Sequence, residues 1–365
     1  MANWWFLWDE WRANGRDLRH GLLAAKEGFV LPDLSFLPTE TKMEVIWKPT
    51  VATRSAAPSN CVLFLSGGSA VVPKAPVKEE FRRLVEAVIE RLGVMQIHHS
   101  YIVPEWRAIL DAEDDPEQRA FCQRAARLGC DPFDVSDSIA AQIEHLGVLL
   151  PEPLAEDFCD AISLVQMTSG AEAVKSFVDS ASATALEAGR WRDISEKLRW
   201  RGAEVPWRDG YKEARALRSY LGRRGPITGG IDSFLKQEFG SLETREFKAA
   251  SWIDAISAPT RNEAPLFGFP PRLREESKRF VLCRAISDYL AFGQPSLVTG
   301  SRTEHQQRNR AFAAEFLAPA ESIKELITGD RVGDEDIEEF AQEFQVSSLI
   351  IRHQIQNHEL AWLGD

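Results

Sequence analysis

Side chains able to do chemistry are thinly spread along this 365-residue chain. Two histidines one helical turn apart can bind zinc, and a G-x-S-x-G or Walker sequence indicates a hydrolase or a nucleotide site. No such sequence is present. Five histidines have no ligand spacing to a carboxylate or cysteine: His98, His99, His145, His353 and His358. The turn Ser66-Gly-Gly-Ser69 lacks a following helix or an adjacent basic residue, so we interpret it as a hairpin turn rather than a phosphate loop.

The segment 278–290 reads as a helix with two distinct sides. Its apolar residues recur at helical spacing: Leu282, Ala285, Ile286, Tyr289 and Leu290. Arg284 and Asp288 are an i,i+4 pair on the opposite side, about 40° apart. We expect them to form an ion pair, which contributes only about 0.2–0.5 kcal/mol if it is exposed.

Residues 205–365 resemble the ImmA/IrrE family of zinc-dependent endopeptidases. The string RF-x-L-x5-D-Y-L at 279–290, followed by NRAFAAEFLAP at 309–319, is similar to the family's RFTLAHELGHxLL and ExxANxFAAELLMP. The segment EDIEEFAQEFQVS at 335–347 is similar to its last helices. The resemblance implies a zincin-like domain in which two histidines and a later glutamate bind zinc, and a glutamate is the general base.

This chain departs from the family at each chemical position. Arg284 and Asp288 stand at the two histidine positions, and Ala285 stands at the general base. His305 stands at the third ligand, with Glu304 beside it about 100° around the helix. Because Arg284 keeps its positive charge, we expect no zinc, no other cofactor and no catalytic residue: a degenerate member of the family.

The resemblance then implies a non-catalytic pseudo-peptidase, a regulatory module that binds another protein. Family members act on partners such as transcriptional repressors in stress-response or mobile-element circuits. The residues expected to bind the partner are Arg279, Arg284, Asp288 and Arg308. The alternative is an atypical metal-dependent endopeptidase that cleaves a partner repressor, with Asp288, His305 and the possible substitute Glu304 as its ligands.

Charge along the C-terminal region is uneven. Residues 270–310 carry a local charge of +4, and residues 311–345 carry −8. Either the two segments neutralise each other across the fold, or the basic one forms a groove for an acidic peptide or a phosphate-bearing ligand. Nucleic-acid binding by the helix pair 334–344 and 347–360 is not expected, because Arg352 is the only lysine or arginine of its second helix.

The elements that must position these residues form a predominantly helical α+β protein. Within residues 1–37 we expect a short helix that packs on the body through its aromatic residues, or alternatively an exposed aromatic arm for a partner. A strand is expected near 43–48, and a hairpin over 61–72 around the glycine pair. Helices are expected at 77–92 and, after residue 103, at 103–112, 116–129, 134–148, 153–167, 171–188 and 190–200. The expected domains are an N-terminal helix plus small α/β module (1–100), a helical region (101–204) and the ImmA/IrrE-like domain (205–365).

Composition excludes several classes of protein. At 44% hydrophobic and 27% charged residues the chain is a folded protein rather than a disordered or fibrous one. Its net charge of −12 argues against broad nonspecific nucleic-acid binding. An odd set of five distant cysteines without CxxC spacing indicates reduced thiols. No signal peptide and no apolar run of membrane-spanning length is recognised, so we expect a cytoplasmic protein with no membrane contact.

Overall fold

The computed structural model describes residues 21–22, 30–49, 62–198, 205–227, 231–240, 242–248, 252–271, 273 and 275–364. The fold is mixed α+β and 57% helical, with 14 helices and three small sheets in the described ranges, which confirms the predicted class. Contacts divide the chain into two compact units, Met1–Arg119 and Ala120–Asp365. Across the described ranges, none of the helices combines the length and apolar character that crossing a bilayer requires.

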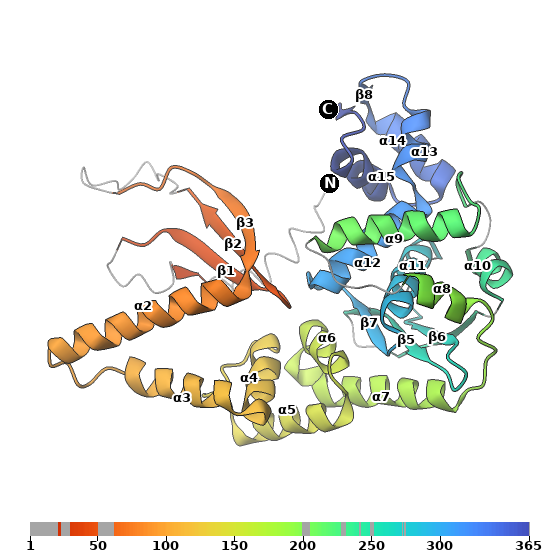
Figure 1. Cartoon of the computed structure of the whole chain (residues 1–365). Helices are drawn as coiled ribbons and strands as arrows, with labels where there is room; N and C mark the ends of the chain where they lie inside the picture. Colours follow the sequence, from red (N-terminus) through yellow and green to blue (C-terminus); the bar gives the residue numbers. More distant parts are fainter. Residues whose placement is uncertain are drawn as a thin grey trace. The chain divides into compact units, whose positions relative to one another are not determined.

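The first unit is built on a three-stranded antiparallel sheet in the order β1-β2-β3 (Figure 1). Its elements are β1 (Asp33–Pro38), β2 (Lys42–Lys48), β3 (Gly68–Pro73), α2 (Lys74–Val94) and α3 (Ile102–Asp114), and α4 (Pro116–Arg127) crosses into the second unit. Phe36 of β1 meets Phe81 of α2 edge to face at a ring distance of 4.8 Å, which packs the helix on the sheet.

The aromatic-rich start of the predicted short N-terminal helix lies outside the described residues, and residues 33–38 form β1. One prediction for this unit is wrong. The predicted hairpin around the glycine pair does not form, because β3 runs unbroken from Gly68 and pairs with β2. A Cβ at position 68 would lie 2.7 Å from the Trp47 ring, so glycine there lets the ring cross the neighbouring strand.

Helices of the second unit begin with α5 (Asp137–Leu149), α6 (Leu154–Ala161), α7 (Met167–Ala183) and α8 (Trp191–Leu198). The predicted single helix over 153–167 is wrong. Ile162 and Ser163 have extended backbones, and a 3-10 turn at Leu164–Gln166 precedes α7. This break turns the chain from α6, which contacts strand β7 (Ser296–Thr299), to α7, which contacts strand β5 (Ile253–Pro259).

A four-stranded sheet with helices on both faces forms the centre of the second unit (Figure 1). Its order is β4 (Glu243–Glu246), β6 (Pro265–Phe269), β5 (Ile253–Pro259) and β7 (Ser296–Thr299), with β4 parallel to β6 and the other pairs antiparallel. Phe267 and Val298 pack in one core with α8, α11 (Glu275–Phe292) and α12 (Glu304–Leu317). Leu266 and Leu297 pack in another core with α5–α7. Helices α5–α7 and the four-stranded sheet therefore share a hydrophobic core.

The other elements of the second unit lie in residues 205–365, the region that resembles the ImmA/IrrE family. They are α9 (Pro206–Tyr220), α10 (Ile231–Phe239), α11 (Glu275–Phe292), α12 (Glu304–Leu317), α13 (Ala320–Leu326), β8 (Arg331–Val332), α14 (Asp334–Phe344), α15 (Ser348–Asn357) and β9 (Trp362–Leu363). Helices α9 and α12 pack at close range, since a Cβ at Gly210 would lie 2.1 Å from the Arg308 carbonyl oxygen. Helices α14 and α15 confirm the predicted C-terminal pair and bury a small core of their own.

Candidate functional site

Helix α11 is buried on both of its predicted sides. The apolar stripe from Leu282 to Leu290 lies in the core, as predicted. Arg284 is only 4% exposed and Asp288 is fully buried, because α12 and β7 cover that side of the helix. The prediction of an Arg284–Asp288 ion pair is wrong, because each side chain bonds to other groups instead.

Arg284 ties three elements together. Its Nε donates to Asn309 Oδ1 at 2.8 Å, and its Nη2 donates to Gln306 Oε1 at 2.7 Å, both on α12. The same Nη2 donates to the Thr299 carbonyl of β7 at 2.8 Å. Its Nη1 lies 3.7 Å from Asp254 Oδ2 on β5. The guanidinium thus occupies the space between α11, α12 and the sheet.

Asp288 forms a second network beside it. The carboxylate accepts hydrogen bonds from Arg308 Nη2 at 2.9 Å and Asn309 Nδ2 at 2.7 Å. Arg308, itself fully buried, donates through Nη1 to Glu213 Oε2 of α9 at 2.9 Å. Burial raises the pKa of Asp288, an effect that His305 and Arg308 oppose. Burial likewise raises the pKa of Glu213, to about 7, against the opposing charge of Arg308.

Glu304 and His305 are the first two residues of α12. His305 Nε2 lies 3.1 Å from Asp157 Oδ2 of α6, and its Nδ1 lies 3.2 Å from Thr303 Oγ1. Glu304 is 7% exposed. Sequence reasoning missed Asp157, since no spacing connects it to a residue 148 positions later, and only the packing of α6 on β7 brings it here.

These donors do not fit a zinc ion. Within the described ranges, no group of three or more His, Cys, Asp and Glu side chains could hold a metal. Asp288 and His305 are interleaved with the charged guanidiniums of Arg284 and Arg308, which would repel a divalent cation. Ala285, at the general-base position, is fully buried in the core and carries no proton acceptor.

The four residues predicted to bind a partner lie in the interior: Arg279, Arg284, Asp288 and Arg308, with exposures of 6%, 4%, 0% and 0%. Arg279 donates to Gln345 Oε1 and to the Ile227 carbonyl, which joins α11 to two distant segments. These side chains hold elements together, so direct contact with a partner would have to occur through groups nearer the surface. Two such groups are Asp254, whose side chain is 34% exposed, and Arg310.

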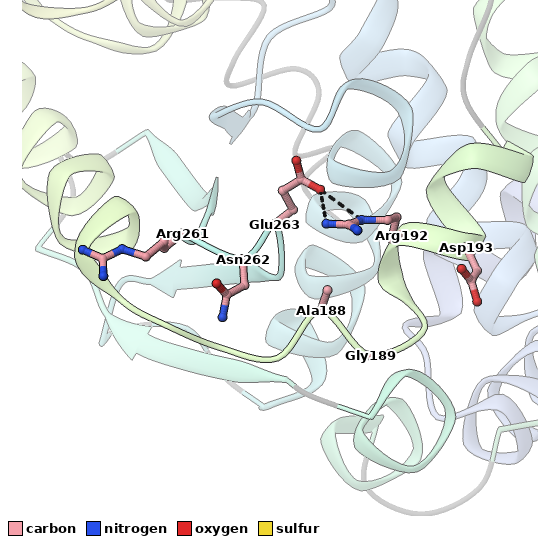
Figure 2. Close-up of a pocket in the computed structure, with 7 residues that line it drawn as sticks. All are labelled: Ala188, Gly189, Arg192, Asp193, Arg261, Asn262 and Glu263. Atoms are coloured by element: carbon pink, nitrogen blue, oxygen red, sulfur yellow. Dashed lines mark hydrogen bonds and ion pairs between the residues drawn. The ribbon is translucent and has the colours of Figure 1, made fainter.

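A surface hollow lies elsewhere in the second unit (Figure 2). It measures about 470 Å³ and separates the turn between β5 and β6 from the segment before α8. The Arg192–Glu263 ion pair, 2.7 Å long and largely exposed, crosses it, and Arg261 points away from that pair. The hollow is lined by exposed charges and contains none of the residues that carry the resemblance, so we take the Arg284 cluster as the candidate site.

Neither the family models nor the curated proteins compared with this chain give a match.

Proposed function

We propose that residues 205–365 form a non-catalytic, ImmA/IrrE-like pseudo-peptidase that acts in the cytoplasm as a regulatory protein-binding module. One observation carries the proposal: the side chains at the positions of the family's two zinc-binding histidines are buried and bonded to other protein groups. Arg284 is bonded to Asn309, Gln306 and Thr299, and Asp288 is bonded to Arg308 and Asn309.

Peptide hydrolysis by a zinc site needs three protein ligands, an open fourth position for water and a nearby base. Here a guanidinium that stays charged fills the space between the two helices, and Ala285 cannot accept a proton. Such a site supports recognition without cleavage. The resemblance suggests a protein partner, such as a transcriptional regulator in stress-response or mobile-element regulation.

Metal content tests the proposal most directly. Protein purified without a histidine tag or chelator is analysed by plasma mass spectrometry, beside the variants Asp288→Asn and His98→Ala. We expect close to no transition metal in all three. About one metal per chain that disappears in Asp288→Asn and persists in His98→Ala, whose side chain is exposed, would overturn the proposal in favour of an atypical metallopeptidase.

A further inference from the structure

Polar side chains join helix α15 to α9 and α12. Helices α13–α15 bury a core of their own, and Val346 packs against both this core and the core of α11 and α12. Gln354 Nε2 of α15 donates a hydrogen bond to Glu315 Oε2 of α12 at 2.8 Å. Asn357 Nδ2 donates to the Tyr211 hydroxyl of α9 at 3.0 Å. Hydrogen bonds between side chains thus fasten the end of α15 to two helices outside its own core.

His358 lies at this junction, beside a buried carboxylate. Its Nε2 is 3.5 Å from Oε2 of Glu315, a residue that is 1% exposed. Glu315 Oε1 accepts a hydrogen bond from Arg215 Nε of α9, whose side chain is 48% exposed. His358 Nε2 and Gln354 Oε1 are both buried, and neither has a hydrogen-bond partner among the described residues. The junction therefore contains two polar atoms whose bonding capacity is unused.

Three features of this position favour a positive charge on the imidazole. A protonated Nε2 would face the Glu315 carboxylate, where opposite charges attract. The Tyr211 ring lies 4.5 Å from the imidazole between ring centres, within the range of a cation–π contact. His358 is also the C-cap of α15, and the helix dipole stabilises a cation at a helix C-terminus. Protonation of His358 should therefore tighten the packing of α15 on α9 and α12.

The charged and titratable groups around His358 come from both of these helices. They are Glu315 of α12, Tyr211 and Arg215 of α9, and Glu359, which follows His358 in the chain and is exposed. Burial raises the pKa of Tyr211, so its hydroxyl stays neutral near pH 7. Burial also works against ionisation of Glu315, but the contacts with His358 and Arg215 lower its pKa, so this carboxylate stays charged. An imidazole, in contrast, changes its charge between about pH 5 and 8.

We propose that His358 is a pH-sensitive latch that holds the C-terminal helix pair, α14 and α15, on α9 and α12. Its protonated ring attracts the Glu315 carboxylate and packs on Tyr211, and the released helix pair makes neither contact. Because the docked form gains from the proton, docking is strongest at low pH and weakens as the pH rises through the range in which an imidazole titrates. The latch involves none of the Arg284 cluster, so it does not depend on the proposed function.

Hydrogen exchange followed by mass spectrometry tests the latch on the full chain. Wild type, His358→Gln and the control His145→Gln, whose side chain is exposed on α5, are compared at about pH 5.5 and about pH 8, where imidazoles are mostly charged and mostly neutral. Comparison at one pH removes the intrinsic pH dependence of exchange. In peptides from α14 and α15 we expect His358→Gln to exchange about tenfold faster than wild type at the lower pH and equally at the higher. His145→Gln should match wild type at both.

Three results would overturn the inference. Equal exchange of wild type and His358→Gln at the lower pH would show that the imidazolium does not hold the helix pair. The same difference at both pH values would show that the ring acts only by packing, whatever its charge. Faster exchange of His358→Gln in α11 as well as in α15 would show a loss of stability throughout the second unit rather than the release of a local latch.

Discussion

Replacing Asp288 by alanine should destabilise the second unit strongly. The carboxylate is fully buried and accepts hydrogen bonds from Arg308 at 2.9 Å and Asn309 at 2.7 Å. Removing it takes one carboxylate partner from the fully buried Arg308, which keeps its hydrogen bond to Glu213. The sequence alone had placed this residue on a helix side opposite the core, where alanine would change little.

The size of the expected decrease in the free energy of unfolding follows from the burial of the pair. Removing one partner of a buried ion pair costs about 3–5 kcal/mol, since the other charge stays in the interior. Because Glu213 still faces Arg308, we expect the lower end, about 3 kcal/mol. The matched control is Asp334→Ala: that carboxylate pairs with Arg352 but is 57% exposed, so its loss should stay below about 1 kcal/mol.

Hydrogen exchange followed by mass spectrometry measures both losses locally. Amide protons in peptides from α11 and α12 report the opening of the network, independently of the first unit. We expect faster exchange in Asp288→Ala across both helices and wild-type exchange there in Asp334→Ala. Equal protection of α11 and α12 in the two variants would refute the reasoning that Asp288 carries a buried pair.

Three more outcomes are expected. Burial raises the folded-state pKa of Glu213 from 4.5 to about 7, so between these pH values the folded protein holds a proton that the unfolded chain has lost. The free energy of unfolding should therefore fall by about 3 kcal/mol from pH 4.5 to 8. Urea titrations at each pH measure this fall, and Glu213→Gln should flatten it. Gly210→Ala should lower the melting temperature, since its Cβ would strike the α12 backbone, whereas Gly93→Ala, in an open part of α2, should leave it equal or slightly higher. Cys159, 1% exposed and with its pKa raised by burial, should resist iodoacetamide at pH 8 until the protein is unfolded, as peptide mass spectrometry would report.

Each of these has a clear contrary result. A pH profile that is unchanged by Glu213→Gln would show that another group produces the slope. Equal melting temperatures for the two glycine variants would mean that α9 and α12 separate without cost. Labelling of Cys159 in the folded protein would show that the core around α6 opens under native conditions.

Sequence periodicity predicted most helices of the second unit because their apolar stripes are local. The stripe of α11 and the span of α14 are examples. The strands predicted from the sequence all lie in the first unit, so the central sheet, with β5 and β6 among its strands, was missed. Short strands buried on both faces carry no alternation for a sequence pattern to reveal.

The same limit explains the error at Arg284 and Asp288. Spacing placed them correctly on one side of α11 but could not tell what covers that side. The covering groups come from positions 254, 299 and 306–309, which only the sheet and α12 bring together. On an exposed helix face, oppositely charged residues at i and i+4 are expected to pair with each other. When that face is buried, the charged side chains bond instead to groups of the neighbouring elements.

A buried polar cluster of this kind constrains what the site can bind. Every strong bond that Arg284 makes holds α11 to α12 and β7, so a ligand gains little by replacing those bonds. Its remaining Nη1 group lies 3.7 Å from Asp254 Oδ2, so that side of the guanidinium already has a carboxylate partner. A cation there would meet two adjacent guanidiniums. The cluster thus holds the fold together at the positions where the resembling family binds its metal.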